Sequence, residues 1–530
     1  MDVMADHSPC AGSLPRVPAK LEGKVATAPP RPSRTQSVPV SELAAAVDAR
    51  LTSPADAPVL VTGVTLRAQH VLPGDLFAAL PGARAHGADF AAEAVRRGAV
   101  AVLTDEDGAS RPELRDVPVL VHRDPRAALG ALSARVYGEP AARVALWGVT
   151  GTSGKTTTSY MIESCLRAEG RATGLIGTVE TRIAGERLDS AFTTPEAPDL
   201  QALLAVMVER GVGDAVMEVS SHALRLGRVG GAGFAVGAFT NLSQDHLDFH
   251  PDMEDYFQAK AELFDGRARR EVVCVDGEWG RRLVKPGTVT VSATAPVGEA
   301  TWTASGVRVS ATGEQSFTAH GPDGLELAVE LRLPGDFNVA NALLAIGCLH
   351  ASGVSAEAIT RGLAEVQVPG RMQRVDVGQG FTAVVDYSHK PAAVVLALDA
   401  VRARATGRVI TVLGCGGDRD TAKRPLMGAE AARRSEVLVV TDDNPRSEDP
   451  ADIRAAVLAG ALEVPEAERG EVVEIGDRGA AIAHAVSLAA PGDVVVVAGK
   501  GHETGQEVAG VVHPFSDVDA LTGAIKEALR

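Results

Sequence analysis

One glycine-rich segment constrains the fold of this chain more than any other feature. The apolar run VALWGV at 144–149 is followed by GTSGKTT at 151–157, and a helical pattern then continues to about Glu169. This order predicts a buried strand, a tight turn and a helix. Glycines let the backbone of the turn point its N–H groups at an anion, and the helix adds its positive N-terminus. We therefore expect a phosphate-binding loop within an α/β domain.

The residue types in this turn fit the phosphates of a nucleotide. Lys155 supplies a positive charge, and the hydroxyl of Thr156 is placed to bind Mg²⁺. The common pattern G-x-x-x-x-G-K-[ST] requires glycine at position 149, where this chain has Val149, so the match is incomplete by one residue. The alternative is a capped turn without a ligand. The predicted nucleotide-binding residues of the loop are Gly151, Thr152, Ser153, Gly154, Lys155, Thr156 and Thr157.

Length and charge limit the class of protein. A chain of 530 residues exceeds what one hydrophobic core usually serves, so we expect several domains. A net charge of -16 argues against broad binding to nucleic acid or to anionic membranes. No apolar run has the length of a transmembrane helix or the form of a signal peptide, and the five cysteines lack zinc or disulfide spacing. These features favour a cytoplasmic enzyme, which we expect to be a monomer.

Changes in pattern along the chain predict a leader and three domains. Residues 1–38 are rich in Pro, Ala, Ser and Arg without periodicity, which predicts a disordered leader. In residues 39–138, short apolar runs alternate with Ala-rich helical stretches, as in a small α/β domain. Residues 139–370 contain the loop and a β-rich stretch at 288–333. Residues 371–530 again alternate strands and helices, which predicts a doubly wound sheet.

Several further motifs, taken together with the loop, resemble the Mur ligase family. They are TTP at 193–195, MEVSSH at 217–222, NLSQDHLD at 241–248, GDFN at 335–338, GR at 370–371, DYSH at 386–389 and GKGHE at 499–503. The chain is identified as a member of this family of cytoplasmic ATP-dependent amide ligases of peptidoglycan precursor synthesis. The resemblance implies an N-terminal α/β domain for a UDP substrate, a central P-loop ATPase-like domain with a mostly parallel sheet, and a C-terminal Rossmann-like domain for an amino acid.

Three residues outside the loop are catalytic candidates together with Lys155: Glu218, His246 and Lys260. From the residues alone, Glu218 could be a solvated strand end, His246 a structural histidine and Lys260 a surface lysine. The resemblance implies instead that Glu218 and His246 bind Mg²⁺ with Thr156. It also implies that Lys260 reacts with carbon dioxide to give a carbamate, N6-carboxylysine, which supports the metal. Because only a neutral amine reacts, we expect the site to depress the pKa of Lys260.

Asn338, Arg371 and Asp386 resemble further ATP contacts near the boundary between the second and third domains. Taken alone, they could be a turn residue, a surface arginine and an acid at a strand end. If they bind ATP, the nucleotide lies in a cleft between two domains, and closure of the third domain assembles the reaction site. ATP, as a co-substrate, and Mg²⁺ are therefore the expected cofactors.

The segment DNPR at 443–446 indicates which amine is used. Asp-Asn-Pro alone is an ordinary turn signal. In context it resembles the motif of the family branch that adds diaminopimelate to UDP-N-acetylmuramoyl-L-alanyl-D-glutamate. Diaminopimelate differs from lysine by a distal carboxylate, which the guanidinium of Arg446 can hold bidentately, and Glu503 can bind the distal ammonium. The predicted diaminopimelate-binding residues are Arg419, Asp443, Asn444, Pro445, Arg446, Gly499 and Glu503.

The nucleotide-sugar substrate matches a second set of positions. The residues predicted to bind the UDP-muramoyl dipeptide are Leu66, Thr193, Thr194, Ser220 and Arg228. Three positions depart from the family pattern: Ala68 replaces a serine that contacts the uridine portion, Leu226 replaces a glutamine, and Lys390 replaces a frequent threonine. These departures affect individual contacts rather than the reaction.

We expect the chain to phosphorylate the D-glutamyl γ-carboxylate and to join the resulting acyl phosphate to diaminopimelate. One alternative is a ligase of the same superfamily that adds lysine or another amine; Arg446 argues against it. The other is a P-loop ATPase switch or binding protein that makes no amide, which would not need the DNPR and GKGHE motifs in a separate domain. The LL and meso isomers of diaminopimelate both carry the distal carboxylate, so the sequence leaves this choice open.

Overall fold

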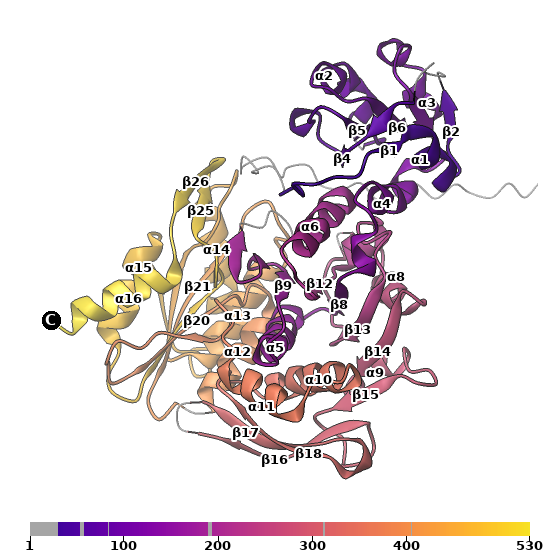
Figure 1. Ribbon diagram of the computed structural model, residues 1–530. Coiled ribbons are helices and arrows are strands. Elements are labelled where there is room, and N and C mark those ends of the chain that lie inside the picture. Colours follow the sequence, from indigo (N-terminus) through magenta and orange to yellow (C-terminus); the bar gives the residue numbers. More distant parts are fainter. Residues whose placement is uncertain are drawn as a thin grey trace, which may run out of the picture.

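The computed structural model describes residues 30–52, 58–82, 84–188, 193–247, 249–310, 313–403 and 405–530. Three large sheets follow one another along the chain, and in Figure 1 the indigo N-terminal part stands apart from the other two, which adjoin each other. We call these parts the N-terminal, central and C-terminal units, with sheets spanning residues 50–121, 145–331 and 373–498. The predicted α/β class with three such units is confirmed. The domain boundaries 39–138, 139–370 and 371–530 stay a prediction.

The N-terminal unit is a five-stranded sheet of order β2-β7-β6-β5-β4. The strands from β4 to β7 are parallel, and β2 is antiparallel at the edge. Its strands are β2 (Arg50–Thr52), β4 (Gly63–Thr65), β5 (Asp75–Ala78), β6 (Ala101–Thr104) and β7 (Val119–Val121), with β1 (Val38–Pro39) and β3 (Leu60–Val61) paired beside them. Its helices are α1 (Val40–Ala46), α2 (Ala91–Arg96), α3 (Glu106–Ala109) and α4 (Pro125–Val136).

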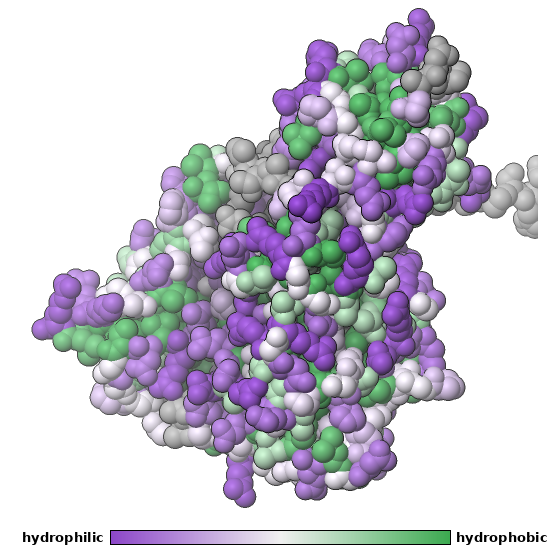
Figure 2. All heavy atoms as spheres, viewed as in Figure 1, coloured by the Kyte–Doolittle hydropathy of each residue, from purple (hydrophilic) through white to green (hydrophobic). Residues whose placement is uncertain are grey.

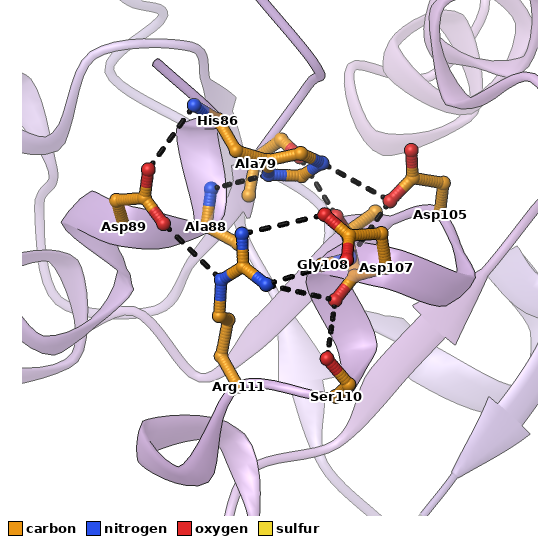
Figure 3. Close-up of polar contacts among 10 residues, drawn as sticks. Ala79, His86, Ala88, Asp89, Asp105, Asp107, Gly108, Ser110 and Arg111 are labelled. Atoms are coloured by element: carbon orange, nitrogen blue, oxygen red, sulfur yellow. Dashed lines mark hydrogen bonds and ion pairs between the residues drawn. The ribbon is translucent and has the colours of Figure 1, made fainter.

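A polar cluster joins the loops that follow β5 and β6 (Figure 3). The Nε2 atom of His86 lies 3.1 Å from Asp105 Oδ1, and His86 Nδ1 accepts a hydrogen bond from the N–H of Ala88 at 3.0 Å. Asp105 also caps α3 by accepting from the N–H of Gly108 at 2.8 Å. Because parallel strands end at the same edge of a sheet, the cluster holds two loops together where α/β sheets place ligands.

Replacing Gly108 with alanine is expected to destabilise this unit by about 1–3 kcal/mol. A Cβ atom there would lie 2.0 Å from Thr104 Oγ1 and 2.7 Å from His86 Cε1, so both side chains would have to move. Chemical denaturation measures the change. Gly523→Ala, in a helix with nothing within 4 Å of the new Cβ, is the control and should be neutral or slightly stabilising. Equal stability of the Gly108→Ala protein and the unaltered chain would contradict the tight packing.

The central unit is an eleven-stranded sheet of order β11-β10-β9-β12-β8-β13-β14-β15-β16-β17-β18. The seven central strands of this order, β9-β12-β8-β13-β14-β15-β16, are parallel. The strands β11 and β10 at one end, and β17 and β18 at the other, pair antiparallel with their neighbours. Thus the sheet is mostly parallel, as predicted. Its strands are β8 (Ala145–Thr150), β9 (Thr173–Ile176), β10 (Thr181–Ile183), β11 (Glu186–Leu188), β12 (Asp214–Glu218), β13 (Phe234–Phe239), β14 (Ala268–Cys274), β15 (Val289–Ser292), β16 (Trp302–Val309), β17 (Gln315–His320) and β18 (Glu326–Leu331).

Helices cover both faces of the central sheet because successive side chains of its strands alternate in direction. In β8, Trp147 and Val149 pack into the core formed with α5, α10 and α11, whereas Leu146 packs into the core formed with α6 and α8. Both faces are therefore apolar, and only strand ends remain for polar groups. The helices are α5 (Lys155–Ala168), α6 (Ala197–Glu209), α7 (Ser221–Arg225), α8 (Met253–Ala261), α9 (Glu278–Arg281), α10 (Phe337–Ala351) and α11 (Ala356–Glu365).

The end of the segment expected to be a disordered leader makes ordered contacts. Residues 1–29 lie outside the described part of the chain. Arg31, however, pairs with the buried carboxylate of Asp75 at 2.5 Å, and the N–H of Ser33 donates to Glu209 of α6 at 2.9 Å. The expectation of disorder therefore does not hold for residues 30–38. They contain few apolar residues, but their charged side chains and backbone N–H groups bind carboxylates of the N-terminal and central units.

The C-terminal unit is a six-stranded sheet of order β19-β20-β24-β21-β22-β23, parallel except for β19. Helices α12, α13 and α14 pack on one face and α15 and α16 on the other, as Figure 1 also shows. This is the predicted Rossmann-like arrangement. The elements are β19 (Gln373–Arg374), β20 (Thr382–Asp386), β21 (Val409–Cys415), β22 (Val437–Asp442), β23 (Glu471–Glu474), β24 (Val494–Ala498), α12 (Pro391–Arg402), α13 (Lys423–Arg434), α14 (Pro450–Glu463), α15 (Arg478–Leu488) and α16 (Asp517–Ala528).

A two-stranded hairpin, β25 (Gly505–Val508) and β26 (Val511–Pro514), extends from the C-terminal unit. Hydrophobic residues gather on it in Figure 2, and Val511 is 55% exposed. An isolated bridge between Arg446 and Val508 attaches the hairpin to the predicted amino-acid-binding loop. Among the described residues, no helix has both the length and the apolar character needed to cross a membrane.

Candidate active site

The glycine-rich loop lies between β8 and α5, as the sequence predicts. Gly151 and Gly154 have φ values of 143° and 86°, which residues with a side chain rarely adopt. A Cβ atom at Gly151 would lie 1.9 Å from Thr240 Oγ1, and one at Gly154 would lie 2.4 Å from Asn341 Oδ1. The loop therefore needs glycine at both positions for its conformation and for the close approach of β13 and α10.

Two lysine amines converge on the loop. Lys155 Nζ donates to the carbonyl oxygens of Gly151 and Thr152 at 2.9 and 3.0 Å, and Lys260 Nζ donates to Gly151 O at 2.8 Å. Desolvation lowers the pKa of Lys155 to about 8, although the charge of Glu218 opposes this shift. Both amines thus lie at the place where an anion is expected.

Lys260 is enclosed by protein rather than exposed. Its side chain is 1% exposed on the inner face of α8, and its Nζ lies 4.5 Å from the centre of the Tyr256 ring. Burial lowers the pKa of Lys260 well below its ordinary value, and the charge of Lys155 lowers it further. The interpretation of Lys260 as a surface lysine is therefore wrong, and a depressed pKa is what carbamate formation requires.

Glu218 ends β12 with its carboxylate directed at the loop. Its Oε2 accepts hydrogen bonds from Thr156 Oγ1 at 3.0 Å and Thr178 Oγ1 at 3.1 Å, and its Oε1 accepts from the N–H of Thr178 at 2.7 Å. Glu218 is 1% exposed, so the interpretation as a solvated strand end is wrong. A buried carboxylate beside a loop hydroxyl supplies two oxygen ligands of the kind that Mg²⁺ prefers.

His246 is held beside the same loop by charged and aromatic neighbours. Its Nε2 lies 3.2 Å from Asp245 Oδ2, and its ring meets the rings of His222 and Tyr256 edge-on at 4.8 and 6.0 Å. Tyr256 in turn contacts the loop, with its hydroxyl 3.1 Å from Thr152 Oγ1. Among the described residues, no three His, Cys, Asp or Glu side chains form a ready metal site. The predicted ligand set, which includes a threonine hydroxyl and a carbamate, stays a prediction.

Two side chains of the C-terminal unit contact the central unit, and one of them contacts the loop. Arg371 NH2 lies 3.5 Å from Thr156 Oγ1, and its guanidinium packs over the Tyr387 ring at 4.6 Å. Lys390 forms an ion pair with Asp245 of the central unit. The contact of Arg371 places the start of the C-terminal unit directly against the glycine-rich loop.

The other two predicted ATP contacts are buried close by. Asp386 accepts hydrogen bonds from the N–H of Met372 at 2.7 Å and from the Ser388 hydroxyl, so its carboxylate fixes the residue that follows Arg371. Asn338 accepts from Asn341 Nδ2 at 3.0 Å, and Asn341 packs against Gly154. Asn338 is therefore connected to the loop through one intervening side chain.

Four of the five residues predicted to bind the UDP substrate lie together beside Glu218. Thr194 Oγ1 donates to the backbone oxygen of Glu218 at 2.8 Å and accepts from the N–H of Ser220 at 3.2 Å. Thr193 Oγ1 lies 3.0 Å from Thr178 Oγ1. Arg228 pairs with Glu196 at 2.8 Å and approaches Thr194 O at 3.5 Å.

Leu66 is the exception, because it belongs to the N-terminal unit. It follows β4 and packs against the core of that unit, half-buried. Its neighbour Arg67 crosses to the central unit, where it pairs with Asp199 of α6 at 3.2 Å. The predicted substrate residues therefore line both sides of the junction between these units rather than one surface.

The predicted amino-acid-binding residues meet at the carboxyl ends of β22 and β24. Asn444 Nδ2 donates to Glu503 Oε2 at 2.8 Å, and Lys500 Nζ donates to Asn444 Oδ1 and Glu503 Oε2 at 3.0 and 3.1 Å. A Cβ atom on Gly499 would lie 2.6 Å from Asp443 Oδ2. The motifs DNPR and GKGHE, far apart in sequence, thus form one polar site.

Arg446 reaches the same site from a strained backbone position with φ 54°. Its NH1 donates to Gly417 O at 2.7 Å, and its Nε lies 3.4 Å from Glu507 Oε2 in the hairpin. Pro445 packs against Gly417, whose Cβ would lie 2.0 Å from Pro445 O. Arg419 is exposed, and within the described residues it forms no hydrogen bond or ion pair with the other predicted members of this set.

Three family models match this chain, and all describe parts of Mur ligases. The Mur ligase middle domain matches residues 149–349, the Mur ligase glutamate ligase domain matches 370–501, and the Mur ligase family catalytic domain matches 60–137. The chain is 53% identical over 503 residues to the UDP-N-acetylmuramoyl-L-alanyl-D-glutamate–2,6-diaminopimelate ligase of Streptomyces coelicolor, covering 94% of this chain and 98% of that protein.

The chain belongs to the Mur ligase family. The relative of the same name from Geobacillus kaustophilus is 44% identical over 476 residues, which cover 88% of this chain and 95% of that protein. A solved structure of a ligase with this name has a TM-score of 0.67 at 30% identity, covering 93% of this chain and all of that one. The MurF ligase of Thermotoga maritima in complex with ADP shares the fold, with a TM-score of 0.61 at 17% identity, covering 88% of this chain and 98% of that one.

Several polar residues that contact the predicted site residues were not themselves among the sequence predictions. They are Thr178 beside Glu218, Asp245 and Lys390 between two units, Lys500 beneath the amino-acid site, and Glu507 beside Arg446. Lys500 lies inside the motif GKGHE, and Lys390 departs from the threonine that is frequent at its position in the family. Thr178 and Glu507 carry no sequence signal, since only the paths of β9 and the hairpin bring them into the site.

Proposed function

We propose that this Mur ligase uses ATP to join diaminopimelate to the D-glutamyl γ-carboxylate of UDP-N-acetylmuramoyl-L-alanyl-D-glutamate, in the cytoplasmic synthesis of peptidoglycan precursors. The names of its relatives support these substrates. The observation that carries the proposal is the position of Thr156, whose Oγ1 lies 3.0 Å from Glu218 Oε2 and 3.5 Å from Arg371 NH2. The unit with the amino-acid site therefore touches the loop that holds the phosphates.

The first step transfers the γ-phosphoryl group to the substrate carboxylate. A carboxylate is a poor acyl donor because its leaving group would be oxide. One carboxylate oxygen therefore attacks the γ-phosphorus, the bond to the β-phosphate oxygen breaks, and ADP and an acyl phosphate form. Two anions must approach each other in this step. Lys155, inside the loop, and Arg371, from the C-terminal unit, supply positive charge where charge develops.

The residues around the loop fit Mg²⁺ as a partner of the nucleotide. Thr156, Glu218, His246 and the carbamate of Lys260 would hold the ion, which when bound neutralises charge on the phosphates. The hydroxyl of Thr156 and the carboxylate of Glu218 already lie 3.0 Å apart, both facing the loop. Lys260 as an ammonium would repel the metal, whereas as a carbamate it is an anion. Its burial and low pKa favour the neutral amine that forms the carbamate.

In the second step a neutral amino group of diaminopimelate attacks the carbonyl carbon of the acyl phosphate. A tetrahedral intermediate forms, its bond to the phosphate oxygen breaks, and the amine proton is released. No protein nucleophile is needed. Arg446 would hold the distal carboxylate, and Glu503 the distal ammonium. In this scheme one oxygen of the substrate carboxylate leaves with phosphate, so ¹⁸O placed in that carboxylate should appear in the phosphate.

Phosphate release tests the proposed reaction. The enzyme is given ATP, Mg²⁺ and UDP-muramoyl dipeptide with, in turn, LL-diaminopimelate, meso-diaminopimelate, lysine or no amine. We expect rapid release only with a diaminopimelate isomer, and the same experiment shows which isomer is used. Release that does not depend on the acceptor and the amine would favour an ATPase switch. Equal turnover with lysine would favour a ligase of the same family for another amine.

A further inference from the structure

A buried ion pair in the C-terminal unit has no part in the reaction described so far. Arg478, the first residue of α15, pairs with Asp517, the first residue of α16. The Nε–Oδ1 and NH2–Oδ2 distances are 2.7 and 2.8 Å, and both side chains are 0% exposed. Removing two charges from water is costly unless their hydrogen bonds are fully used. The remaining donors of the guanidinium therefore show what the pair does.

These donors bind two backbone oxygens at the base of the amino-acid site. Arg478 NH2 lies 2.9 Å from Ala498 O, and NH1 lies 3.3 Å from Asp442 O. Ala498 ends β24 and directly precedes the motif GKGHE, and Asp442 ends β22 and directly precedes DNPR. One planar group thus contacts the starting points of both amino-acid-binding segments.

The sheet itself does not connect these two starting points. In the strand order β20-β24-β21-β22, β21 lies between β24 and β22, so no ladder hydrogen bond joins the two strands directly. The guanidinium of Arg478 links the ends of β22 and β24 past the intervening strand β21. Above it the segments meet closely, since a Cβ on Gly499 would lie 2.6 Å from Asp443 Oδ2 and 3.8 Å from Arg478 NH2.

The positive charge of Arg478 also suits the predicted amino-acid site, which contains carboxylates. Burial alone would lower the pKa of Arg478, but Asp517, Asp443 and Glu503 together raise it above its ordinary value. The guanidinium therefore stays charged beneath a site that contains two carboxylates. Its rigid planar fork suits this place, because a lysine ammonium cannot reach two carbonyls and two carboxylate oxygens in one plane.

We infer that Arg478, oriented by Asp517, is a positioning residue that sets the spacing between residues 443–446 and 499–503 and thereby the affinity for diaminopimelate. This inference rests on the proposed function. It does not give Arg478 a contact with substrate. A change in this spacing separates the partner of the distal carboxylate, Arg446, from the partner of the distal ammonium, Glu503, so diaminopimelate no longer reaches both.

Arg478→Lys and Asp517→Asn test the inference. Each keeps the size of the side chain but loses the bidentate pairing. We expect KM for diaminopimelate to rise by about tenfold or more in both variants, as for other residues that orient the partners of a ligand. KM for ATP and for the UDP substrate should stay within about twofold, because the loop and its neighbours are unchanged. If Arg478 only stabilised the fold, its substitution would not raise KM for diaminopimelate while leaving KM for ATP and for the UDP substrate unchanged.

Arg408→Lys is the matched control. Arg408 also forms a two-point ion pair, with Asp493 Oδ2 at 3.2 Å from Nε and 2.8 Å from NH2. It lies at the opposite ends of β21 and β24, away from the amino-acid site. All three KM values of this variant should equal those of the unaltered enzyme.

The possible results separate the inference from the proposed function. An unchanged KM for diaminopimelate in folded Arg478→Lys or Asp517→Asn, or an equal rise in all three KM values, overturns the positioning role. If Arg478→Lys does not fold, Asp517→Asn decides by the same measurement and by the rise in Tm on adding diaminopimelate, which should shrink. An unaltered enzyme without diaminopimelate-dependent phosphate release would refute the proposed function itself before any variant is compared.

Discussion

In a Lys155→Met enzyme, kcat/KM for amide formation is expected to fall by a factor of at least about 1,000. Lys155 lies within the loop, with Nζ 2.9 and 3.0 Å from the oxygens of Gly151 and Thr152. Methionine keeps the length of the side chain but removes the charge that we assign to the γ-phosphoryl group during transfer. The chain has a second amine at this place, Lys260, but its carbamate form would be negative and could not replace the lost charge.

The loss is measured as phosphate release with all substrates present, together with the affinity for ATP and the unfolding temperature. Lys285→Met is the control, since Lys285 belongs to the same unit but is 46% exposed and pairs with Glu271 at 2.8 Å. It should behave like the unaltered enzyme. If Lys155→Met kept more than about a tenth of the activity, the role in phosphoryl transfer would be wrong, whatever its effect on ATP affinity.

An Arg446→Ala enzyme should show the second largest effect, a rise of about 100-fold in KM for diaminopimelate. The bidentate, charge-assisted contact that we assign to Arg446 recognises the distal carboxylate, which lysine lacks. Arg446 also donates to Gly417 O at 2.7 Å and approaches Glu507 Oε2 at 3.4 Å, so its guanidinium is held in place before the substrate binds. The preference for diaminopimelate over lysine should therefore fall by a similar factor.

Competition between diaminopimelate and lysine at fixed ATP and UDP substrate measures this preference directly. Arg434→Ala serves as the control, because Arg434 lies in the same unit and pairs with Asp399 at 2.8 Å on the surface of α13. Its preference should be unchanged. An Arg446→Ala enzyme that still preferred diaminopimelate to the original extent would show that another residue reads the distal carboxylate.

Local patterns in the sequence were enough for much of the fold. The strand, turn and helix around residues 144–169 appear as β8, the loop and α5, with the helix ending at Ala168. The β-rich stretch at 288–333 appears as β15 to β18. Such elements follow from the spacing of apolar residues and glycines within one segment, which a sequence displays directly. The end of the leader did not follow, because Arg31 and Ser33 are held by Asp75 and Glu209, far along the chain.

The sequence could name candidate site residues only where they stand in motifs. Glu218 and Arg446 could be named from their motifs, but the surroundings that give them chemistry could not. Lys260 is the clearest case, since an amphipathic helix predicts an exposed lysine, whereas the structure buries it beside Gly151. Burial depends on which face of α8 meets the sheet, and that choice is made by the whole core rather than by the helix.

The sequence by itself determined the strand, glycine-rich loop and helix around residues 144–169, the alternation of strands and helices, and the family to which the chain belongs. Each of these depends on residues that are neighbours or stand in contiguous motifs. Only the tertiary structure decided which distant groups meet. The fold brings Thr156 between Glu218 and Arg371. It also places β21 between β22 and β24, and Arg478 contacts the ends of both outer strands. Contacts of this kind depend on distances across a folded sheet, and the spacing of residues along a chain does not specify them.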